Sequence, residues 1–282
     1  MTDKILKDCP TCHGTGWVLR EDKDGRVVAR RCQCYEEWRR SYLWQRANIP
    51  RRYEHCTLEN FEIHHPTQRK ALKISRKFVE DFPVLHSGLL FLGPPGVGKT
   101  HLAVGILKEV IQKKEVRGYF CDFRELIRNI QTSYSQDSPL TEMEVLDPIF
   151  KADLLVLDEL GAKRTTAWVE EMVFYIINNR YINNRLTIFT TNYPDREEDV
   201  EDKRQEFFRK DDVTLVDRVG ERLRSRIYEM CKLVEVDGPD YRKKIKQAGY
   251  RWQGSGKKDR GKIFWVRVCG ERYCEYPGRR ER

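Results

Sequence analysis

Four of the nine cysteines lie close together near the start of the chain, as the pairs Cys9/Cys12 and Cys32/Cys34. Thiolates that arrive from two tight turns can form a closed tetrahedral site, which is typical of structural zinc. The stretch between the pairs predicts a β-hairpin, and so small a region would draw much of its folding free energy from the metal. Reduced free thiols are the alternative, and His13 could replace one thiolate.

A second motif follows a short apolar run and reads Gly93-Pro94-Pro95-Gly96-Val97-Gly98-Lys99-Thr100. It matches G-x-x-x-x-G-K-[ST] between a strand and a helix start, where backbone N–H groups and the helix dipole attract phosphate. Lys99 would contact the β- and γ-phosphates of ATP, and the hydroxyl of Thr100 would contact Mg²⁺. The alternative is a glycine-rich turn with a chance lysine.

Polar side chains follow two further apolar runs of the chain. Asp158 and Glu159 come directly after residues 153–157, and Asn192 follows residues 186–190. Asp158 would hold Mg²⁺ through water, and Glu159 could polarise the water that attacks the γ-phosphate. Asn192 could orient that water. A solvated acidic pair and a plain asparagine turn are the alternatives.

Five short apolar runs must position these groups. The almost unbroken apolar character of the middle runs predicts a parallel sheet covered by helices on both faces, because strands exposed on one face alternate instead. Helical apolar stripes occur within 99–114 and 168–177. The predicted strands are 89–92, 118–121, 153–157, 186–190 and 232–236. The fold class is therefore α/β, and ligands should meet the carboxyl ends of the strands.

The motifs at 93–102, 154–162, 176–181, 190–193, 220–231 and 236–242 resemble those of the DnaC/DnaI-type helicase loaders and the related IstB transposition helpers. These are AAA+ P-loop ATPases, and the resemblance covers about residues 45–242. It implies a five-stranded parallel sheet and ATP bound with Mg²⁺ by residues 93–101, which include His101, and by Asp158. It also places the adenine near 49–61.

The same resemblance implies that Arg226 is an arginine finger and Arg222 its supporting neighbour, both acting on ATP held by an adjacent subunit. Self-assembly through ATP interfaces would follow. Arg242 resembles a sensor-two arginine without the usual helical lid. Spacing alone places Arg222 and Arg226 on one helical face, and a surface ion-pair face would show the same pattern.

The chain carries 53 Lys and Arg against 44 Asp and Glu, a net charge of +9. Residues 240–282 hold 14 of the basic and 5 of the acidic residues, so this tail accounts for the whole excess. It predicts a small basic α+β extension whose interleaved Tyr250, Trp252, Phe264 and Trp265 would bind single-stranded DNA. The alternative is that these aromatics form the core of a mini-domain.

Changes in composition and motif content divide the chain into four regions. Together with the resemblance, they predict a zinc-binding module (1–36), a linker helix (37–52), an AAA+ ATPase domain (53–242) and a basic C-terminal extension (243–282). The chain has no run of about 18 apolar residues that could span a membrane, and residues 1–8 lack the apolar core of a secretory signal. We therefore expect a cytoplasmic protein with reduced thiols.

The cysteine module is similar to the N-terminal zinc module of DnaI-like loaders, which contacts the replicative helicase. Transposition helpers generally begin without it. The sequence thus predicts an ATP-dependent loader of a hexameric replicative DNA helicase onto single-stranded DNA during replication initiation. An IstB-like ATPase that binds DNA and assists a transposase is one alternative, and a nucleotide-binding adaptor with little turnover is another.

Overall fold

The computed structural model describes residues 9–135, 138–163, 166–195 and 213–244, and the backbone of 266–268 and 271–273. The chain divides into two compact units, residues 1–245 and 246–282. Residues 196–212 and the four tail aromatics lie outside the described residues. None of the described helices is long and apolar enough to cross a membrane.

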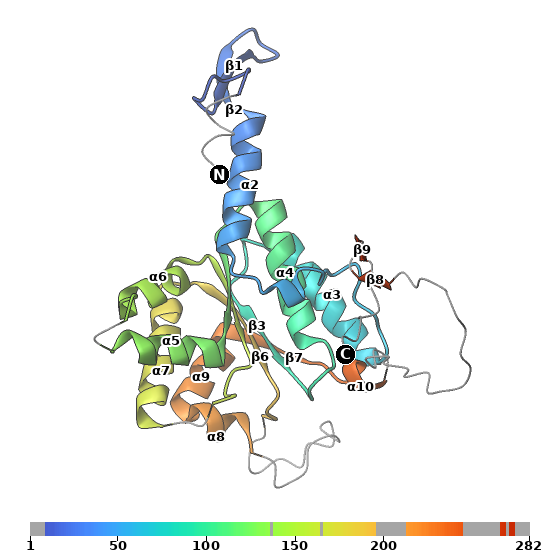
Figure 1. The fold of residues 1–282 in the computed structure, drawn as a ribbon, viewed down its shortest axis with the longest axis vertical. Coiled ribbons are helices and arrows are strands. Elements are labelled where there is room, and N and C mark those ends of the chain that lie inside the picture. Colours follow the sequence, from blue (N-terminus) through green and yellow to red (C-terminus); the bar gives the residue numbers. More distant parts are fainter. Residues whose placement is uncertain are drawn as a thin grey trace, which may run out of the picture. The chain divides into compact units, whose positions relative to one another are not determined.

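A five-stranded parallel sheet forms the centre of the first unit, with strand order β4-β5-β6-β3-β7 (Figure 1). Its strands are β3 (Gly88–Leu92), β4 (Gly118–Asp122), β5 (Leu154–Asp158), β6 (Leu186–Thr191) and β7 (Cys231–Glu235). Every residue of β3 and β5 is buried. The predicted fold class is confirmed, and each strand agrees with its predicted run to within one residue at either end.

Helices cover both faces of this sheet (Figure 1). One face carries α3 (Pro66–Asp81) and α4 (Lys99–Lys114); the other carries α5 (Phe123–Ser133), α6 (Glu142–Lys151), α7 (Ala167–Ile182), α8 (Leu215–Val219) and α9 (Glu221–Met230). Alternation along β3 separates the two cores: Leu89 and Phe91 belong to the α3/α4 side, and Leu90 and Leu92 to the other. The strand pleat therefore explains why a continuous apolar run is needed here.

The N-terminal region forms an antiparallel hairpin of β1 (Trp17–Glu21) and β2 (Val27–Arg31), as predicted. The helix α2 (Gln33–Arg46) begins four residues before the predicted linker helix, so the second cysteine pair lies at its start. The segment after α2 attaches to the sheet edge, where Phe120 N–H donates to the Ala47 carbonyl (2.8 Å) and Asn48 Nδ2 donates to the Phe120 carbonyl (3.1 Å). A short 3-10 turn, η1 (Arg51–Tyr53), follows.

After β7 the structure describes α10 (Tyr241–Lys244), and the second unit contains the antiparallel pair β8 (Val266–Val268) and β9 (Glu271–Tyr273). These strands fall within the predicted basic α+β extension. Most of that extension lies beyond the described residues.

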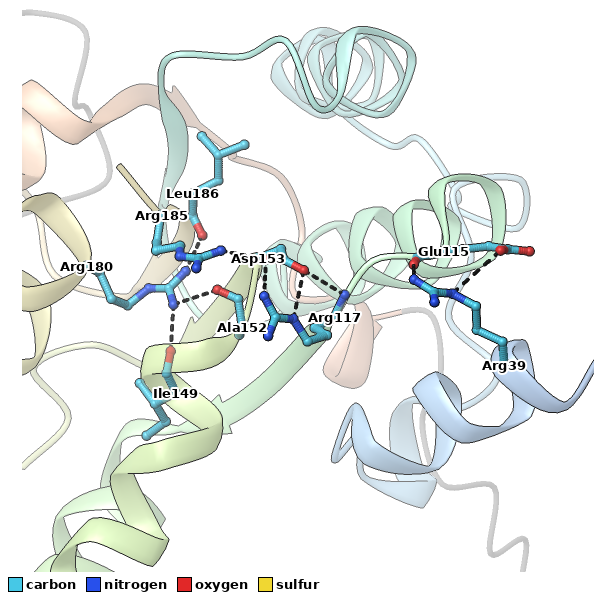
Figure 2. A network of polar contacts seen from close by, with 9 residues as sticks. All are labelled: Arg39, Glu115, Arg117, Ile149, Ala152, Asp153, Arg180, Arg185 and Leu186. Carbon is cyan, nitrogen blue, oxygen red and sulfur yellow. Dashed lines mark hydrogen bonds and ion pairs between the residues drawn. The ribbon is translucent and has the colours of Figure 1, made fainter. Parts of the chain in front are cut away.

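A polar network closes the amino-terminal edge of the sheet (Figure 2). The guanidinium of Arg180, on α7, is fully buried. It donates to the carbonyls of Ile149 (2.6 Å), Ala152 (3.0 Å) and Leu186 (2.6 Å), and to the Thr187 hydroxyl (2.9 Å). Burial lowers the pKa of Arg180 to about 9. The last carbonyls of a helix have no N–H partner within that helix, and the Arg180 side chain supplies donors to them at the end of α6.

Arg180→Met should reduce the free energy of unfolding by about 3–5 kcal/mol, because buried carbonyls lose their donors. Denaturant unfolding would measure this loss. Arg185→Met is the matched control: its guanidinium pairs with Asp153 (2.6 Å) and is partly exposed, so we expect a loss of about 1 kcal/mol or less. Equal losses for the two variants would contradict a special role for Arg180.

Candidate nucleotide site

The phosphate loop connects β3 to α4, and its glycines are required by geometry. Gly93 and Gly98 have φ values of 148° and 101°, which side-chain-bearing residues rarely adopt. A Cβ on Gly93 would lie 1.8 Å from the Val236 carbonyl oxygen, and one on Gly98 would lie 2.6 Å from the Phe61 ring. The strand, loop and helix therefore form the close-packed arrangement predicted from the motif.

Lys99 is buried at the start of α4, and its Nζ donates to the carbonyls of Gly93 and Pro94, each at 2.8 Å. Burial lowers the pKa of Lys99 to about 8, and the nearby Asp158 carboxylate opposes that shift. The ammonium group is therefore held inside the loop by weak neutral acceptors. Phosphate oxygens would be stronger acceptors for it and would favour its charged form.

Asp158 ends β5 and is buried beside two hydroxyl groups. Thr100 Oγ1 and Thr190 Oγ1 both donate to Asp158 Oδ1, at 2.8 and 2.6 Å. Burial raises the pKa of Asp158 to about 6, although both hydroxyls oppose the shift. An oxygen donor set of a carboxylate and a hydroxyl suits Mg²⁺, which is usually bound by one or two carboxylates together with phosphate oxygens.

Asp158→Asn should stabilise the nucleotide-free protein at pH 7.5 by roughly 1–3 kcal/mol. The folded pKa of about 6 lies above the ordinary aspartate pKa of 3.8, so the wild type loses stability as pH rises from about 4 to about 6. Thermal unfolding at pH 4.5 and 7.5 would test this, and the gain should shrink at the lower pH. Asp153→Asn is a control at a carboxyl whose pKa is shifted in the opposite direction, because hydrogen bonds from Arg117 hold the pKa of Asp153 low despite its burial.

Glu159 follows Asp158 with a left-handed φ of 56°, and its N–H donates to Thr190 Oγ1 (3.0 Å). Its carboxylate forms an ion pair with Arg124 Nη2 (2.8 Å) in the first turn of α5. Sequence reasoning missed Arg124, because an arginine in a helix carries no local signal of this contact. Arg124 can therefore hold the carboxylate that was predicted to polarise the attacking water.

Asn192 directly follows β6, the neighbour of β5 in the sheet. The end of β6 is tied to the loop after β5, because Thr191 Oγ1 donates to the Leu160 carbonyl (3.0 Å) and Leu160 N–H donates to the Thr190 carbonyl (2.8 Å). Asn192 and the acidic pair thus leave the sheet at one edge. Its action on the attacking water stays a prediction.

The segment predicted to adjoin the adenine packs against the start of α4. His101 Nε2 lies 2.8 Å from the Thr57 carbonyl oxygen and 3.0 Å from Asn60 Oδ1. The Phe61 ring meets the His101 ring edge-on, with centroids 5.3 Å apart. Direct contact of His101 or this segment with adenine stays a prediction.

Two further contacts hold the phosphate loop in place, and neither was predicted from the sequence. Buried Gln68, on α3, donates from Nε2 to the Val97 carbonyl (3.0 Å). From the other side, Tyr241 N–H donates to the Gly96 carbonyl (3.1 Å). The residue after Tyr241 is Arg242, and its charge contributes to the lowered pKa of Lys99. The segment after β7 therefore lies against the phosphate loop.

Arg222 and Arg226 lie on one face of α9 and point toward α7. Both guanidinium groups stack over the Phe174 ring at 4.5 Å, and Arg226 also lies 5.4 Å from the Tyr181 ring. Arg222 makes a long, exposed ion pair with Glu171 (3.9 Å). Their shared face fits both the arginine-finger and the ion-pair interpretation.

The four cysteines converge, with all four Sγ atoms within 4.8 Å of one another. Cys9 and Cys32 Sγ are 3.7 Å apart, and Cys12 and Cys34 Sγ are 3.4 Å apart. Tetrahedral zinc with bonds of about 2.3 Å separates its sulfurs by about 3.8 Å, whereas a disulfide would bring two of them to about 2.05 Å. The donor set therefore fits zinc.

Two details of this cluster bear on the ligands. Backbone hydrogen bonds at Cys12 and Thr11 lower the pKa of the Cys9 thiol to about 6, which favours its thiolate, whereas burial raises the pKa of the Cys34 thiol. His13, the alternative ligand, is not part of the cluster of possible metal ligands in the described part of the chain, which consists of the four cysteines.

The glycine loop between β3 and α4, the acidic strand end and the sheet order define a P-loop nucleotide-binding domain of the AAA+ class. Residues 24–249 match the model for IstB-like ATP-binding proteins, and the chain belongs to this family.

Similar proteins of known name support this family assignment. The chain is 30% identical over 148 residues to the replicative helicase loader DnaC of Buchnera aphidicola subsp. Acyrthosiphon pisum. The matched residues make up 52% of this chain and 59% of that protein. The chain thus spans less than two thirds of that relative. It is 25% identical over 263 residues to the phage-like element PBSX protein XkdC of Bacillus subtilis, 89% of this chain and 90% of that protein. A crystal structure of the DnaC helicase loader, 36% identical, aligns with a TM-score of 0.56 over 67% of this chain and 100% of its own.

Proposed function

We propose that this protein is an ATP-dependent loader that places a hexameric replicative helicase on single-stranded DNA during replication initiation. The observation that carries the proposal is the joint presence of a complete phosphate-loop site, on a domain similar to the DnaC loader, and a four-cysteine module before it. The family match by itself would also suit an IstB-like helper of a transposase, but such helpers generally begin without a cysteine module.

In this function the nucleotide site acts as a switch. Lys99 would leave the carbonyls of Gly93 and Pro94 and donate to the phosphates, while Thr100 and Asp158 would hold Mg²⁺. Mg²⁺ would supply charge neutralisation for the phosphates. Glu159 would accept a proton from the attacking water.

The flanking regions would bring the substrates together. Zn²⁺ held by the four cysteines would cross-link the N-terminal module, which would contact the helicase. The basic tail would bind single-stranded DNA, since its excess of Lys and Arg can displace counterions from phosphates.

A loading assay would test this proposal. The protein, the replicative helicase of the source organism and circular single-stranded DNA would be mixed, and DNA-bound helicase would be counted with and without ATP. We expect ATP-dependent loading by the wild type and none by Lys99→Ala. Failure of the wild type to bind the helicase, together with ATP-dependent binding to duplex DNA and to a transposase, would support the IstB-like alternative instead.

We expect about one zinc per purified chain, measured by atomic absorption. Cys12→Ser and Cys32→Ser should lose the zinc and the helicase affinity while retaining ATP affinity, because the thiolates cross-link only the N-terminal module. Cys56→Ala is a control, since Cys56 is a buried thiol outside the cluster and its variant should keep the zinc. An active wild type without zinc would refute the metal assignment.

A further inference from the structure

The buried amide of Gln68, in the first turn of α3, makes hydrogen bonds to three backbone groups. Its side-chain oxygen Oε1 accepts from the N–H groups of His64 (2.7 Å) and His65 (3.0 Å). Its Nε2 donates to the Val97 carbonyl in the phosphate loop (3.0 Å). Because an N–H group can only donate and a carbonyl can only accept, these partners determine which way the amide points.

The bond from Gln68 sets the direction of one peptide group of the loop. In a trans peptide the carbonyl and the N–H point in opposite directions, and the peptide between Val97 and Gly98 is trans. Holding the Val97 carbonyl therefore turns the Gly98 N–H to the other side of the peptide. In the same way, the bond from Tyr241 N–H to the Gly96 carbonyl (3.1 Å) turns the Val97 N–H away from Tyr241.

The two N–H groups oriented in this way are available to an anion. Val97 lies between Gly96 and Gly98, whose φ values are 84° and 101°. Turns of this kind bring successive N–H groups to one concave side, which attracts phosphate. Among the residues that the structure describes, none accepts a hydrogen bond from the N–H of Val97 or Gly98. The contacts to the two carbonyls thus leave both N–H groups free for a ligand.

The segment after β7 covers the Gln68 amide and keeps it away from water. Asp237 N–H donates to Thr67 Oγ1 (2.8 Å), and this hydroxyl lies 3.2 Å from the Asp237 carbonyl oxygen, to which it donates. A Cβ on Gly238 would lie 2.9 Å from Gln68 Nε2, so the backbone passes directly against the amide. Gln68 is consequently only 3% exposed. It lies where the start of α3, the phosphate loop and the segment after β7 meet.

A purely structural role for Gln68 leaves the choice of side chain unexplained. Gln68 is the N3 residue of a capping box, in which the His65 side chain accepts from Thr67 N–H (3.3 Å). Glutamate serves at N3 as well as glutamine does, because the box needs only an acceptor at that position. The bond to the Val97 carbonyl needs a donor. Only an amide satisfies the helix cap and the loop carbonyl together.

We propose that Gln68 is a positioning residue for nucleotide binding, which acts on the phosphates through the Val97–Gly98 peptide. Gln68 holds the Gly98 N–H in its binding direction before the nucleotide arrives, so the loop loses less conformational freedom when phosphate binds. The inference rests on the nucleotide-switch part of the proposed function and does not depend on which partner is loaded.

Two substitutions of Gln68 in the full-length chain separate positioning from capping. Gln68→Glu keeps the acceptor for the His64 and His65 N–H groups but has no donor for Val97. Gln68→Met loses the donor without adding a charge. His65→Ala is the matched control, because it removes the other side chain of the capping box and leaves the Gln68 amide in place. Affinities for fluorescent ATP and ADP analogues, hydrolysis at saturating ATP and denaturant unfolding would be measured for each variant.

We expect both Gln68 variants to bind ATP and ADP about tenfold or more weakly. Their hydrolysis rate at saturating ATP should change by less than about threefold, because the lost interaction supports bound nucleotide before and during the reaction alike. His65→Ala should unfold at a lower denaturant concentration than the wild type, yet its nucleotide affinity should stay within about twofold of the wild-type value.

Four results would overturn this role. Equal losses of nucleotide affinity in His65→Ala and in the Gln68 variants would assign Gln68 to the helix cap alone. A loss in Gln68→Glu but not in Gln68→Met would attribute the effect to the added charge. Wild-type affinity in both Gln68 variants would leave the phosphate-loop site standing without Gln68. A wild type that binds neither ATP nor ADP would overturn the nucleotide switch itself, and this inference with it.

Discussion

Glu159→Gln is expected to bind ATP with wild-type affinity and to hydrolyse it at least about 100-fold more slowly. The amide keeps the shape of the carboxylate but cannot accept a proton from water. It would also keep the left-handed turn after β5, because the backbone N–H of residue 159 is held by Thr190 Oγ1. Steady-state phosphate release and the affinity for a fluorescent ATP analogue would be measured, each with and without single-stranded DNA.

Arg124→Gln is the matched control for this prediction. It removes the 2.8 Å ion pair with Glu159 but leaves the carboxylate itself in place, so hydrolysis should change by only a few-fold. A Glu159→Gln variant that turns over at the parental rate would reassign the base. A wild type that binds ATP without measurable turnover, with or without DNA, would instead favour the adaptor alternative.

The parts of the site that sequence reasoning located are those in which the chemistry is local in the chain. The phosphate loop combines its glycines, Lys99 and Thr100 within eight consecutive residues. Asp158 and Glu159 sit at the end of a strand that is apolar because both of its faces are buried. Burial on both faces leaves a continuous apolar run, so the strand ends, and with them the acidic pair, could be predicted.

The parts that were missed depend on contacts between distant segments. Gln68 reaches a loop carbonyl 29 residues away, and Thr67 Oγ1 accepts from Asp237 N–H across 170 residues. Arg180 looks like one more charged helical residue until the fold buries it beside the end of α6.

Arg226→Ala is expected to bind ATP normally and to hydrolyse it up to about 10³-fold more slowly. In its own chain the Arg226 guanidinium stacks on Phe174 and Tyr181 of α7, and its Nη1 is buried without a hydrogen-bond partner among the described residues. If Arg226 is an arginine finger, its charge stabilises the γ-phosphate bound by a neighbouring subunit. Lys99→Ala has the reverse defect, because it loses the contact to ATP in its own phosphate loop.

Mixing the two inactive variants distinguishes a trans-acting finger from an ion-pair face. An interface that joins the intact phosphate loop of Arg226→Ala to the intact Arg226 of Lys99→Ala contains one complete site, so the mixture should regain part of the wild-type rate. Arg222→Ala is a graded control: its guanidinium shares Phe174 but is exposed and pairs with Glu171 at 3.9 Å, so a smaller loss is expected. If the mixture stays inactive although co-purification shows that the variants assemble, or if Arg226→Ala alone retains the parental rate, then α9 carries a surface ion-pair face and hydrolysis is completed within one chain.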